Sequence, residues 1–424
     1  MSKKFILLTV VIAIICSFYT TWAEPDISSP SAILIDSKTG RVLYEKECDV
    51  KRYPASTTKI MTGILCIELG SLNDIVTIGT NPSQIERGSS QIYLIPGEQL
   101  TLEQLLYAMM LESANDASIA IAEHISGSVE EFVKLMNKRA KELGANDTNF
   151  VNPHGLHDDN HVTTARDLAL IAKHAMTLPK FREVVATVNY TIPETNKQPA
   201  RDYITNSNKL IWKINKTYSY DYAIGIKTGY TTKAKNNLVA GALKDDMELI
   251  SVVMNENSTN SSSNMYTNTI ELFEYGFNNY TNKKLLTENQ IVTTITIPKT
   301  EEKINLLASR DFDLTISEDE ISNIETSLNL VDEIEKPIRK GQILGYISYS
   351  IEGHIIDKIP LLAAEELLVP DKKSNPILRW LLRLFLAYII WRTIVVYSRY
   401  RKKKRRKIKE APTLFMNRKR GRIW

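Results

Sequence analysis

The chain has 424 residues, of which 43% are hydrophobic, so it is long enough for two to three domains and too apolar to be a disordered chain. Its net charge of +4 hides a division, because the segment from Asp371 to Trp424 holds 18 basic residues against two acidic ones, a net of +16. Residues 1–370 therefore carry a net charge of −12, which argues against a nucleic-acid-binding core.

Residues 1–23 have the features of a cleaved signal peptide. Two lysines near the start precede an apolar stretch from Phe5 to Phe18, and small residues up to Ala23 offer a cleavage site before Glu24. The apolar stretch is short for a membrane span, so an uncleaved N-terminal anchor is the less favoured alternative.

The cysteines and histidines do not form a recognisable framework. After cleavage only Cys48 and Cys66 remain, which is too few for a disulfide scaffold in an exported chain of this size. Two buried thiols are favoured over a single bridge. No clustered His/Cys pattern indicates a metal, so we expect neither a metal nor a cofactor.

The first elements of the exported part are a β-hairpin and a helix. The apolar runs Ala32–Asp36 and Arg41–Tyr44 flank a glycine-containing turn, which predicts the hairpin. A Lys-Thr-Gly triplet at Lys38 lies in that turn, and we assign it to turn chemistry. Pro54 then leads into a helical pattern that begins close to Ser56.

Helical and strand patterns continue as far as residue 280. Helices are predicted at Leu102–His124, Glu130–Leu143, Ala165–Met176 and Ile270–Phe277, and strands at Tyr222–Ile226, Leu238–Ala240 and Leu249–Val253. Strands at both ends with helices between them predict an α+β domain over residues 24–280, in which an antiparallel sheet packs against a helical cluster.

A small all-β domain is predicted for residues 281–370, after a polar break at Asn278–Asn282. Its short strand-like runs are Val292–Ile297, Ile304–Leu307, Phe312–Ile316, Ile343–Tyr349 and His354–Pro360. These runs contain no convincing catalytic constellation, so a spacer or binding role is the default.

Residues 371–398 predict a linker and a C-terminal membrane helix, and residues 399–424 predict a basic cytoplasmic tail. The segment Ile377–Tyr397 is apolar apart from three arginines towards its ends, from which long side chains can snorkel. The alternative is an amphipathic helix in the membrane plane, which would gather the arginines on one face, whereas Arg392 falls roughly opposite the other two. By the positive-inside rule the body would lie outside the cytoplasm.

Ser56-Thr57-Thr58-Lys59 supplies a nucleophile and a base. On a helix, Ser56 and Lys59 project from the same face. A partly desolvated amine can take the serine proton if its pKa falls, and a helix N-terminus adds positive backbone dipole where an oxyanion would form. For an isolated match, an N-cap serine beside a solvated lysine is an equally good interpretation.

Two further motifs follow along the chain. Ser113-Ala114-Asn115 offers a second hydroxyl and an amide in a predicted helix-to-helix turn, and Lys227-Thr228-Gly229 places a cation at the end of a predicted strand. Alone, each is explained by capping, turn or strand-exit residues. Together with the serine–lysine pair, however, they provide a nucleophile, its base, a second hydroxyl–amide pair and a cation for a carboxylate.

With these three motifs in this order, the chain resembles the penicillin-binding serine peptidases and, more narrowly, the low-molecular-mass D-alanyl-D-alanine carboxypeptidases. The stretches that carry the resemblance are Ala55–Thr62, Ser113–Ala117, Asn152–Leu156, Thr163–Ala169 and Gly225–Thr231. The similarity covers about Ser29 to Gly276, and the β-rich segment and the anchor match the family's layout. It implies a β-lactamase/transpeptidase-like catalytic domain and serine-type carboxypeptidase activity without a cofactor.

The resemblance implies roles for the residues that carry the chemistry. Ser56 would attack the carbonyl of the penultimate D-alanine, with Lys59 as its base. Ser113 would relay the proton towards the nitrogen of the leaving D-alanine. Water would then hydrolyse the acyl-enzyme, and β-lactams would acylate the same serine.

It also implies how the substrate would be held. Asn115 would bind the substrate backbone, and Lys227 and Thr228 would hold the terminal carboxylate, with Gly229 leaving room for it. The backbone amide of Tyr230, together with that of the nucleophile, would form the oxyanion hole.

One residue departs from the family pattern, and two histidines lie in a matching stretch or close to it. Lys235 stands where the family usually has glycine, which affects the local turn and the substrate range but removes no proposed catalytic group. His154 and His157 are candidate general bases, but their turn-rich segment favours a structural role.

The partners expected from this interpretation are the stem pentapeptide of peptidoglycan, β-lactam antibiotics and the lipids around the anchor, with no nucleic acid. The enzyme would lie on the extracytoplasmic face of the bacterial membrane, held by a single C-terminal span. A β-lactamase, or a non-catalytic module that senses β-lactams or binds the wall, is the alternative. Stable penicillin labelling and D-alanine release would discriminate among the three.

Overall fold

The computed structural model describes residues 23–86, 88–213, 217–257, 263–298, 301–335, 337–368 and 376–409. The predicted signal peptide, apart from its last residue, and the predicted tail beyond residue 409 lie outside these ranges. The predicted domain boundaries at residues 280 and 370 stay predictions.

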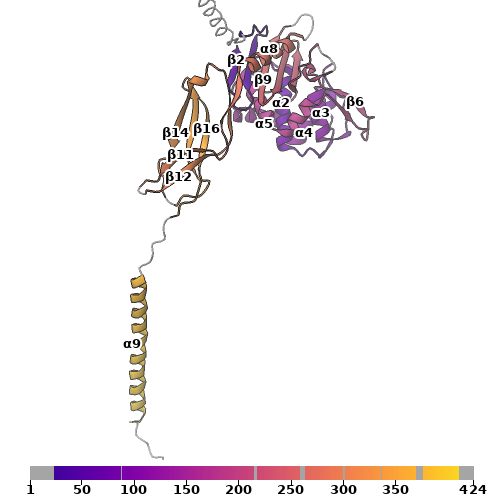
Figure 1. Cartoon of the computed structure of the whole chain (residues 1–424). Helices are drawn as coiled ribbons and strands as arrows, with labels where there is room; N and C mark the ends of the chain where they lie inside the picture. The colour runs from indigo at the N-terminus through magenta and orange to yellow at the C-terminus, as the bar shows by residue number, and fades with distance from the viewer. Residues whose placement is uncertain are drawn as a thin grey trace, which may run out of the picture.

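A five-stranded antiparallel sheet organises the larger part of the chain, at the upper right of Figure 1. Its strand order is β2-β1-β9-β8-β7. The strands span Ser31–Asp36 (β1), Val42–Lys46 (β2), Ala223–Thr231 (β7), Lys235–Lys244 (β8) and Met247–Glu256 (β9). Strand β1 of the predicted N-terminal hairpin therefore pairs with β9, from the far end of the domain sequence, and the predicted α+β arrangement is confirmed.

Both faces of this sheet are covered by helices. Because successive side chains of a strand point to opposite faces, Ile33 and Ile35 join one core while Ala32 and Leu34 join another. The first core is formed with α2 (Lys59–Leu69), α3 (Leu102–Leu111), α4 (Asn115–Ser126), α5 (Val129–Glu142), α6 (Ala165–Ala175) and α7 (Pro179–Ala186), and the second with α8 (Ser263–Asn279).

The helical pattern over Leu102–His124 forms two helices, which meet at the predicted turn at Ser113–Asn115. The segment Leu102–His124 is not continuous, because α3 ends at Leu111 and α4 begins at Asn115. The break is at Ser113, whose φ of 63° is in the left-handed region that a right-handed helix cannot contain. The break places a serine and an asparagine in a tight corner between two buried helices.

The second part of the chain is built of strands, as predicted. A five-stranded antiparallel sheet has the order β11-β12-β16-β15-β14, and β10 pairs with β13. The strands span Thr281–Leu286 (β10), Ile291–Thr296 (β11), Lys303–Ala308 (β12), Phe312–Ile316 (β13), Ile324–Leu330 (β14), Ile343–Ile351 (β15) and His354–Ala363 (β16). Of these, β10 and β14 were not predicted, because both are rich in exposed polar residues.

The turn between β1 and β2 joins the two parts. Arg41 donates to the backbone carbonyl of Thr315 and pairs with Glu320, while Thr315 Oγ1 donates to Asp36 over 2.6 Å. Lys38, in the Lys-Thr-Gly triplet assigned to turn chemistry, lies 3.1 Å from Asp313. This second Lys-Thr-Gly run is therefore part of a domain contact.

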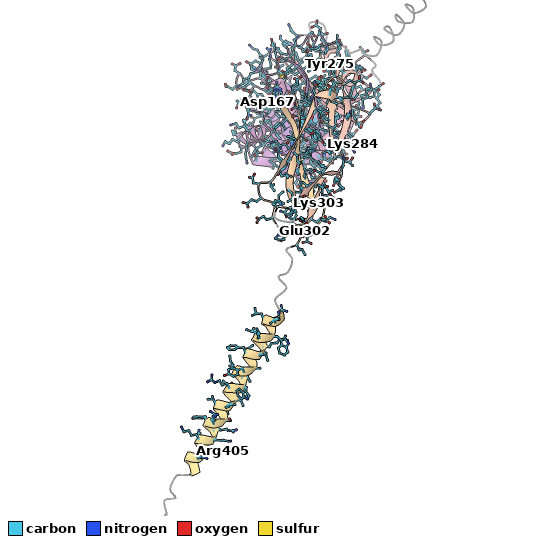
Figure 2. All side chains as sticks on the ribbon, turned by 60° about the vertical axis from the view of Figure 1, so that its left-hand side comes forward. Asp167, Tyr275, Lys284, Glu302, Lys303 and Arg405 are labelled. Atoms are coloured by element: carbon cyan, nitrogen blue, oxygen red, sulfur yellow. The ribbon has the colours of Figure 1, made fainter. Side chains whose placement is uncertain are left out.

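The helix α9 (Pro376–Lys409) follows the β-rich part in the chain. Its stretch Ile377–Arg406 is long and apolar enough to cross a membrane. Figure 2 shows Glu302 and Lys303 at the end of the β-rich part that faces α9, and Arg405 near the opposite end of the helix. The basic residues thus gather at the end of α9 farther from the folded domains.

Candidate active site

A cavity of about 970 Å³ opens between the edge strand β7 and the helical cluster, and all three motifs reach it. Its lining includes Ser56, Ser113, Asn115, Thr228, Gly229 and Tyr230. Lys59 and Lys227 are 0% and 1% exposed and contact the cavity through hydrogen bonds to lining side chains. The fold therefore brings together every residue that the sequence predicts for the site.

Ser56 lies in a 3-10 turn, Ala55–Thr58, that leads directly into α2. This position agrees with the predicted helix start, although regular α-helix begins only at Lys59, and Ala55 has a φ of 51° in the left-handed region. Two glycines allow other segments to approach this turn. A Cβ at Gly155 would lie 1.9 Å from the carbonyl oxygen of Ala55, and one at Gly229 would lie 3.0 Å from the amide nitrogen of Ser56.

Three oxygen atoms lie within hydrogen-bond distance of Lys59 Nζ. Its Nζ lies 3.1 Å from Ser56 Oγ, 2.6 Å from Asn115 Oδ1 and 2.6 Å from the backbone oxygen of His154. Burial, and then the charge of Lys227, place the pKa of Lys59 well below its usual range, although Asp116 opposes the shift. A lysine in this environment can be neutral and accept a proton from the serine.

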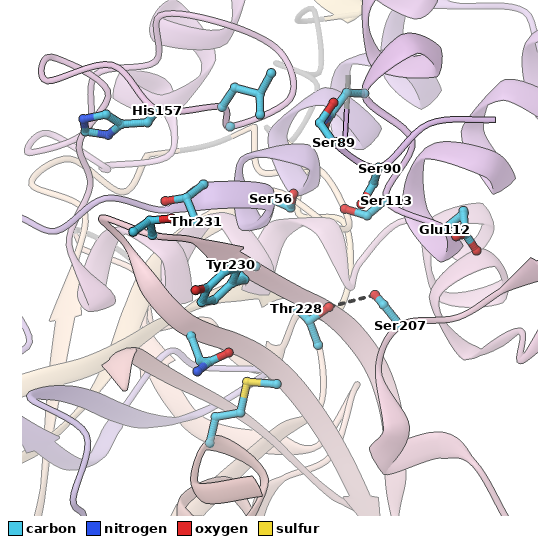
Figure 3. Close-up of a pocket in the computed structure, with 18 of the residues that line it drawn as sticks. Ser56, Ser89, Ser90, Glu112, Ser113, His157, Ser207, Thr228, Tyr230 and Thr231 are labelled. Carbon is cyan, nitrogen blue, oxygen red and sulfur yellow. Dashed lines mark hydrogen bonds between the residues drawn. The ribbon is translucent and has the colours of Figure 1, made fainter. Parts of the chain in front are cut away.

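Ser113 and Asn115 occupy the corner between α3 and α4. The left-handed backbone of Ser113 directs its hydroxyl towards the cavity beside Ser56, as Figure 3 shows. Asn115 is 3% exposed, and its backbone N–H donates to the backbone oxygen of Ser90 over 2.8 Å. The side-chain oxygen of Asn115 is thereby fixed against Lys59.

Lys227 and Thr228 meet a serine that the sequence analysis missed. Ser207 follows β6 (Arg201–Thr205), and its Oγ lies 3.3 Å from Lys227 Nζ and 2.7 Å from Thr228 Oγ1. Burial lowers the pKa of Lys227 to about 7, and the charge of Glu112 opposes this shift. Burial also raises the pKa of Glu112, which lines the same cavity.

Three histidines lie close to the site. The ring of His154 accepts from the amide of Leu156, and burial lowers its pKa to about 3, so it is neutral. His157 lines the cavity and meets the ring of Tyr53 edge-on at 4.7 Å. His161, which the sequence analysis passed over, lies 2.8 Å from Thr58 Oγ1 and supports the turn that carries the nucleophile.

Lys235 has a φ of 59°, in the left-handed region that favours glycine. It is the first residue of β8 and pairs with Thr231 of β7, so the turn between the two strands forms with a lysine at this position.

The residues that the structure describes include no group of three or more His, Cys, Asp or Glu side chains arranged to hold a metal. The two cysteines within the described ranges, Cys48 and Cys66, are both free and buried.

Comparison with known families gives two matches along the chain. Residues 19–258 match the S11 peptidase model, described as D-alanyl-D-alanine carboxypeptidase. Residues 280–367 match the C-terminal domain of penicillin-binding protein 5. The two matches follow the division between the α+β part and the β-rich part.

Individual proteins give the same result. The D-alanyl-D-alanine carboxypeptidase DacF of Bacillus subtilis is 35% identical over 343 residues, covering 80% of this chain and 85% of that protein. The carboxypeptidase DacC of Escherichia coli is 33% identical, covering 81% and 86%. The crystal structure of penicillin-binding protein 5 from Haemophilus influenzae superposes with a TM-score of 0.68 at 30% identity, covering 82% of this chain and 99% of that one.

Proposed function

The chain belongs to the D-alanyl-D-alanine carboxypeptidase family, and on that premise we propose that it removes the terminal D-alanine from peptidoglycan stem peptides through an acyl-enzyme on Ser56. Membership of this family confirms the resemblance found in the sequence. It also confirms the predicted fold class and the predicted type of enzyme. The observation that carries the assignment of the nucleophile is the 3.1 Å contact between Ser56 Oγ and the buried Nζ of Lys59.

The first half of the reaction forms the acyl-enzyme. Neutral Lys59 takes the proton of Ser56 as Oγ attacks the carbonyl carbon of the penultimate D-alanine. The C–N bond then breaks, and the proton passes by way of Ser113 to the nitrogen of the departing D-alanine. The peptide remains as an ester on the serine, and water hydrolyses that ester to release the shortened peptide and regenerate the hydroxyl.

The cavity provides matching groups for the rest of the substrate. The amides of Ser56 and Tyr230 would stabilise the oxyanion, which is consistent with the close approach of Gly229 to the serine backbone. Asn115 would hold the peptide backbone, and Lys227 and Thr228 the terminal carboxylate. A β-lactam presents the same carbonyl and carboxylate and would acylate Ser56.

The C-terminal helix supports a location at the membrane. Its apolar stretch Ile377–Arg406 would anchor the enzyme, with its basic end in the cytoplasm and the folded domains on the extracytoplasmic face, where peptidoglycan is available. Membrane lipids around α9, the stem pentapeptide and β-lactams are therefore the proposed partners.

A single variant tests the function. The wild-type chain should release D-alanine from a stem pentapeptide and retain a labelled penicillin as a stable adduct. Ser56→Ala should lose both, whereas Ser83→Ala, which removes an exposed hydroxyl outside the cavity, should lose neither. Rapid hydrolysis of the penicillin would indicate a β-lactamase, and stable labelling without D-alanine release a sensor.

A further inference from the structure

The charge of Lys227 does not face the cavity directly. The lysine is 1% exposed, whereas the hydroxyls of Ser207 and Thr228 line the cavity side by side, joined by the dashed line in Figure 3. An anion in the cavity would therefore meet two hydroxyl groups, with the ammonium beyond them.

Lys227, Ser207 and Thr228 form a chain of hydrogen bonds that starts at the ammonium group. An ammonium can only donate, so Lys227 Nζ donates to Ser207 Oγ over 3.3 Å. The hydroxyl hydrogen of Ser207 is then available for Thr228 Oγ1, 2.7 Å away, or for an anion in the cavity. A hydroxyl that accepts a hydrogen bond from a cation becomes a better donor. The ammonium of Lys227 therefore strengthens the hydrogen bonds that these hydroxyls can donate to an anion in the cavity.

The position of Ser207 is fixed by its own backbone. Its amide donates to the carbonyl of Leu111 over 3.0 Å, and its carbonyl accepts from the Tyr266 hydroxyl over 3.2 Å. The next residue, Asn208, is fully buried and caps a short 3-10 helix by accepting from the amide of Leu210. A hydroxyl held in this way loses little conformational freedom when a ligand binds.

We infer that Ser207 binds the terminal carboxylate of the substrate, together with Thr228, and that Lys227 acts on that carboxylate through the two hydroxyls. This inference rests on the proposed function and adds to it a residue outside the three motifs. The segment that follows β6 and carries Ser207 would then help the enzyme to select peptides that end in a free carboxylate.

The test compares two peptides that differ only at this group: an acylated D-alanyl-D-alanine with a free carboxylate and the same peptide as its C-terminal amide. For Ser207→Ala we expect kcat/KM on the free acid to fall about 10-fold to 100-fold, mainly through KM, because a hydrogen bond to a charged group is lost. The amide should be affected less than about twofold. Ser207→Thr, which keeps the hydroxyl, should restore binding of the acid.

Competition with labelled penicillin measures the affinity of both peptides, so the comparison does not depend on cleavage of the amide. Equal losses on acid and amide, or no loss on either, would overturn the inference, as would failure of Ser207→Thr to recover acid binding. Ser83→Ala serves as the matched serine control. If the wild-type chain releases no D-alanine, it is instead the proposed function that fails.

Discussion

The Nζ atom of Lys59 lies 2.6 Å from the backbone carbonyl oxygen of His154, an acceptor that cannot donate in return. The side-chain oxygen of Asn115 is a second acceptor at the same distance. A neutral amine has two N–H groups, and these two oxygens use both. The remaining lone pair is then directed at Ser56, so the two acceptors set the direction in which the lysine accepts a proton.

Asn115→Asp should raise the pKa of Lys59, because it places a negative charge in contact with the ammonium. More of the lysine is then protonated at neutral pH, so the acid limb of Ser56 acylation should move upward by about one pH unit or more. The measurement is the second-order rate of labelling by penicillin across pH. Asn329→Asp, on the exposed face of β14, adds the same charge far away and should leave the limb in place. An unchanged limb in Asn115→Asp would contradict this account of the base.

The pKa of Lys227 predicts a loss of carboxylate recognition at alkaline pH. Burial lowers that pKa to about 7, so in the free enzyme the lysine is charged below this pH and neutral above it. For a peptide with a free carboxylate, kcat/KM should therefore fall as pH rises through about 7.

Glu112→Gln should move this decline to lower pH, because the charge of Glu112 is what opposes the lowering of the Lys227 pKa. The measurement is a pH series of kcat/KM for the variant and the wild type. Glu325→Gln removes an exposed carboxylate in β14 and is the matched control. Superimposable profiles for Glu112→Gln and the wild type would show that the two groups do not interact.

Gly155→Ala should abolish acylation of Ser56 and destabilise the fold by about 3 kcal/mol or more, because its Cβ would overlap the Ala55 backbone. Gly127 has a similar φ, 81° against 89°, but a Cβ there would meet nothing within 4 Å. Gly127→Ala should therefore cost only about 1–2 kcal/mol, from the backbone conformation alone. Urea unfolding and penicillin labelling of both variants test the difference, and equal costs would show that the contact with Ala55 is unimportant.

Arg41→Ala should weaken the attachment of the β-rich part by about 2 kcal/mol, because the Arg41 side chain is only 11% exposed and its loss removes one donor each from Glu320 and from the carbonyl of Thr315. Lys38→Ala removes a neighbouring pair that is 52% exposed at the lysine and should cost less than about 1 kcal/mol. Calorimetry should show the unfolding of the two parts separating in the first variant only. Identical unfolding traces for the two variants would contradict the prediction that Arg41 contributes more than Lys38 to the attachment.

The sequence could predict the site where the chemistry depends on short motifs. Ser56 and Lys59 are three residues apart, so local geometry alone brings them together. Ser207 and His161 could not be found in this way, because each acts through contacts with residues 20 or more positions away and belongs to no motif. In the sequence alone, their polar side chains look like those of ordinary turn residues.

The fold shows the same limit. Alternating apolar residues identified most strands of both sheets, since burial on one or both faces leaves a pattern of period two. The edge strand β14 escaped because six of its seven residues are exposed. The turn at Ser113–Asn115 could be predicted from its capping and turn residues, but its left-handed backbone could not, because that conformation depends on tertiary contacts such as that of Asn115 with Ser90.

The turn that follows β1 also has a mechanical consequence. The chain passes from α8 into β10 at Tyr280, and Asp36 and Arg41 make a second, separate attachment to β13 and the loop that follows it. A body fixed at one point can swivel, but a body fixed at two loses that rotational freedom. The cavity therefore keeps a constant orientation relative to the β-rich part, and the two parts should turn together as one body.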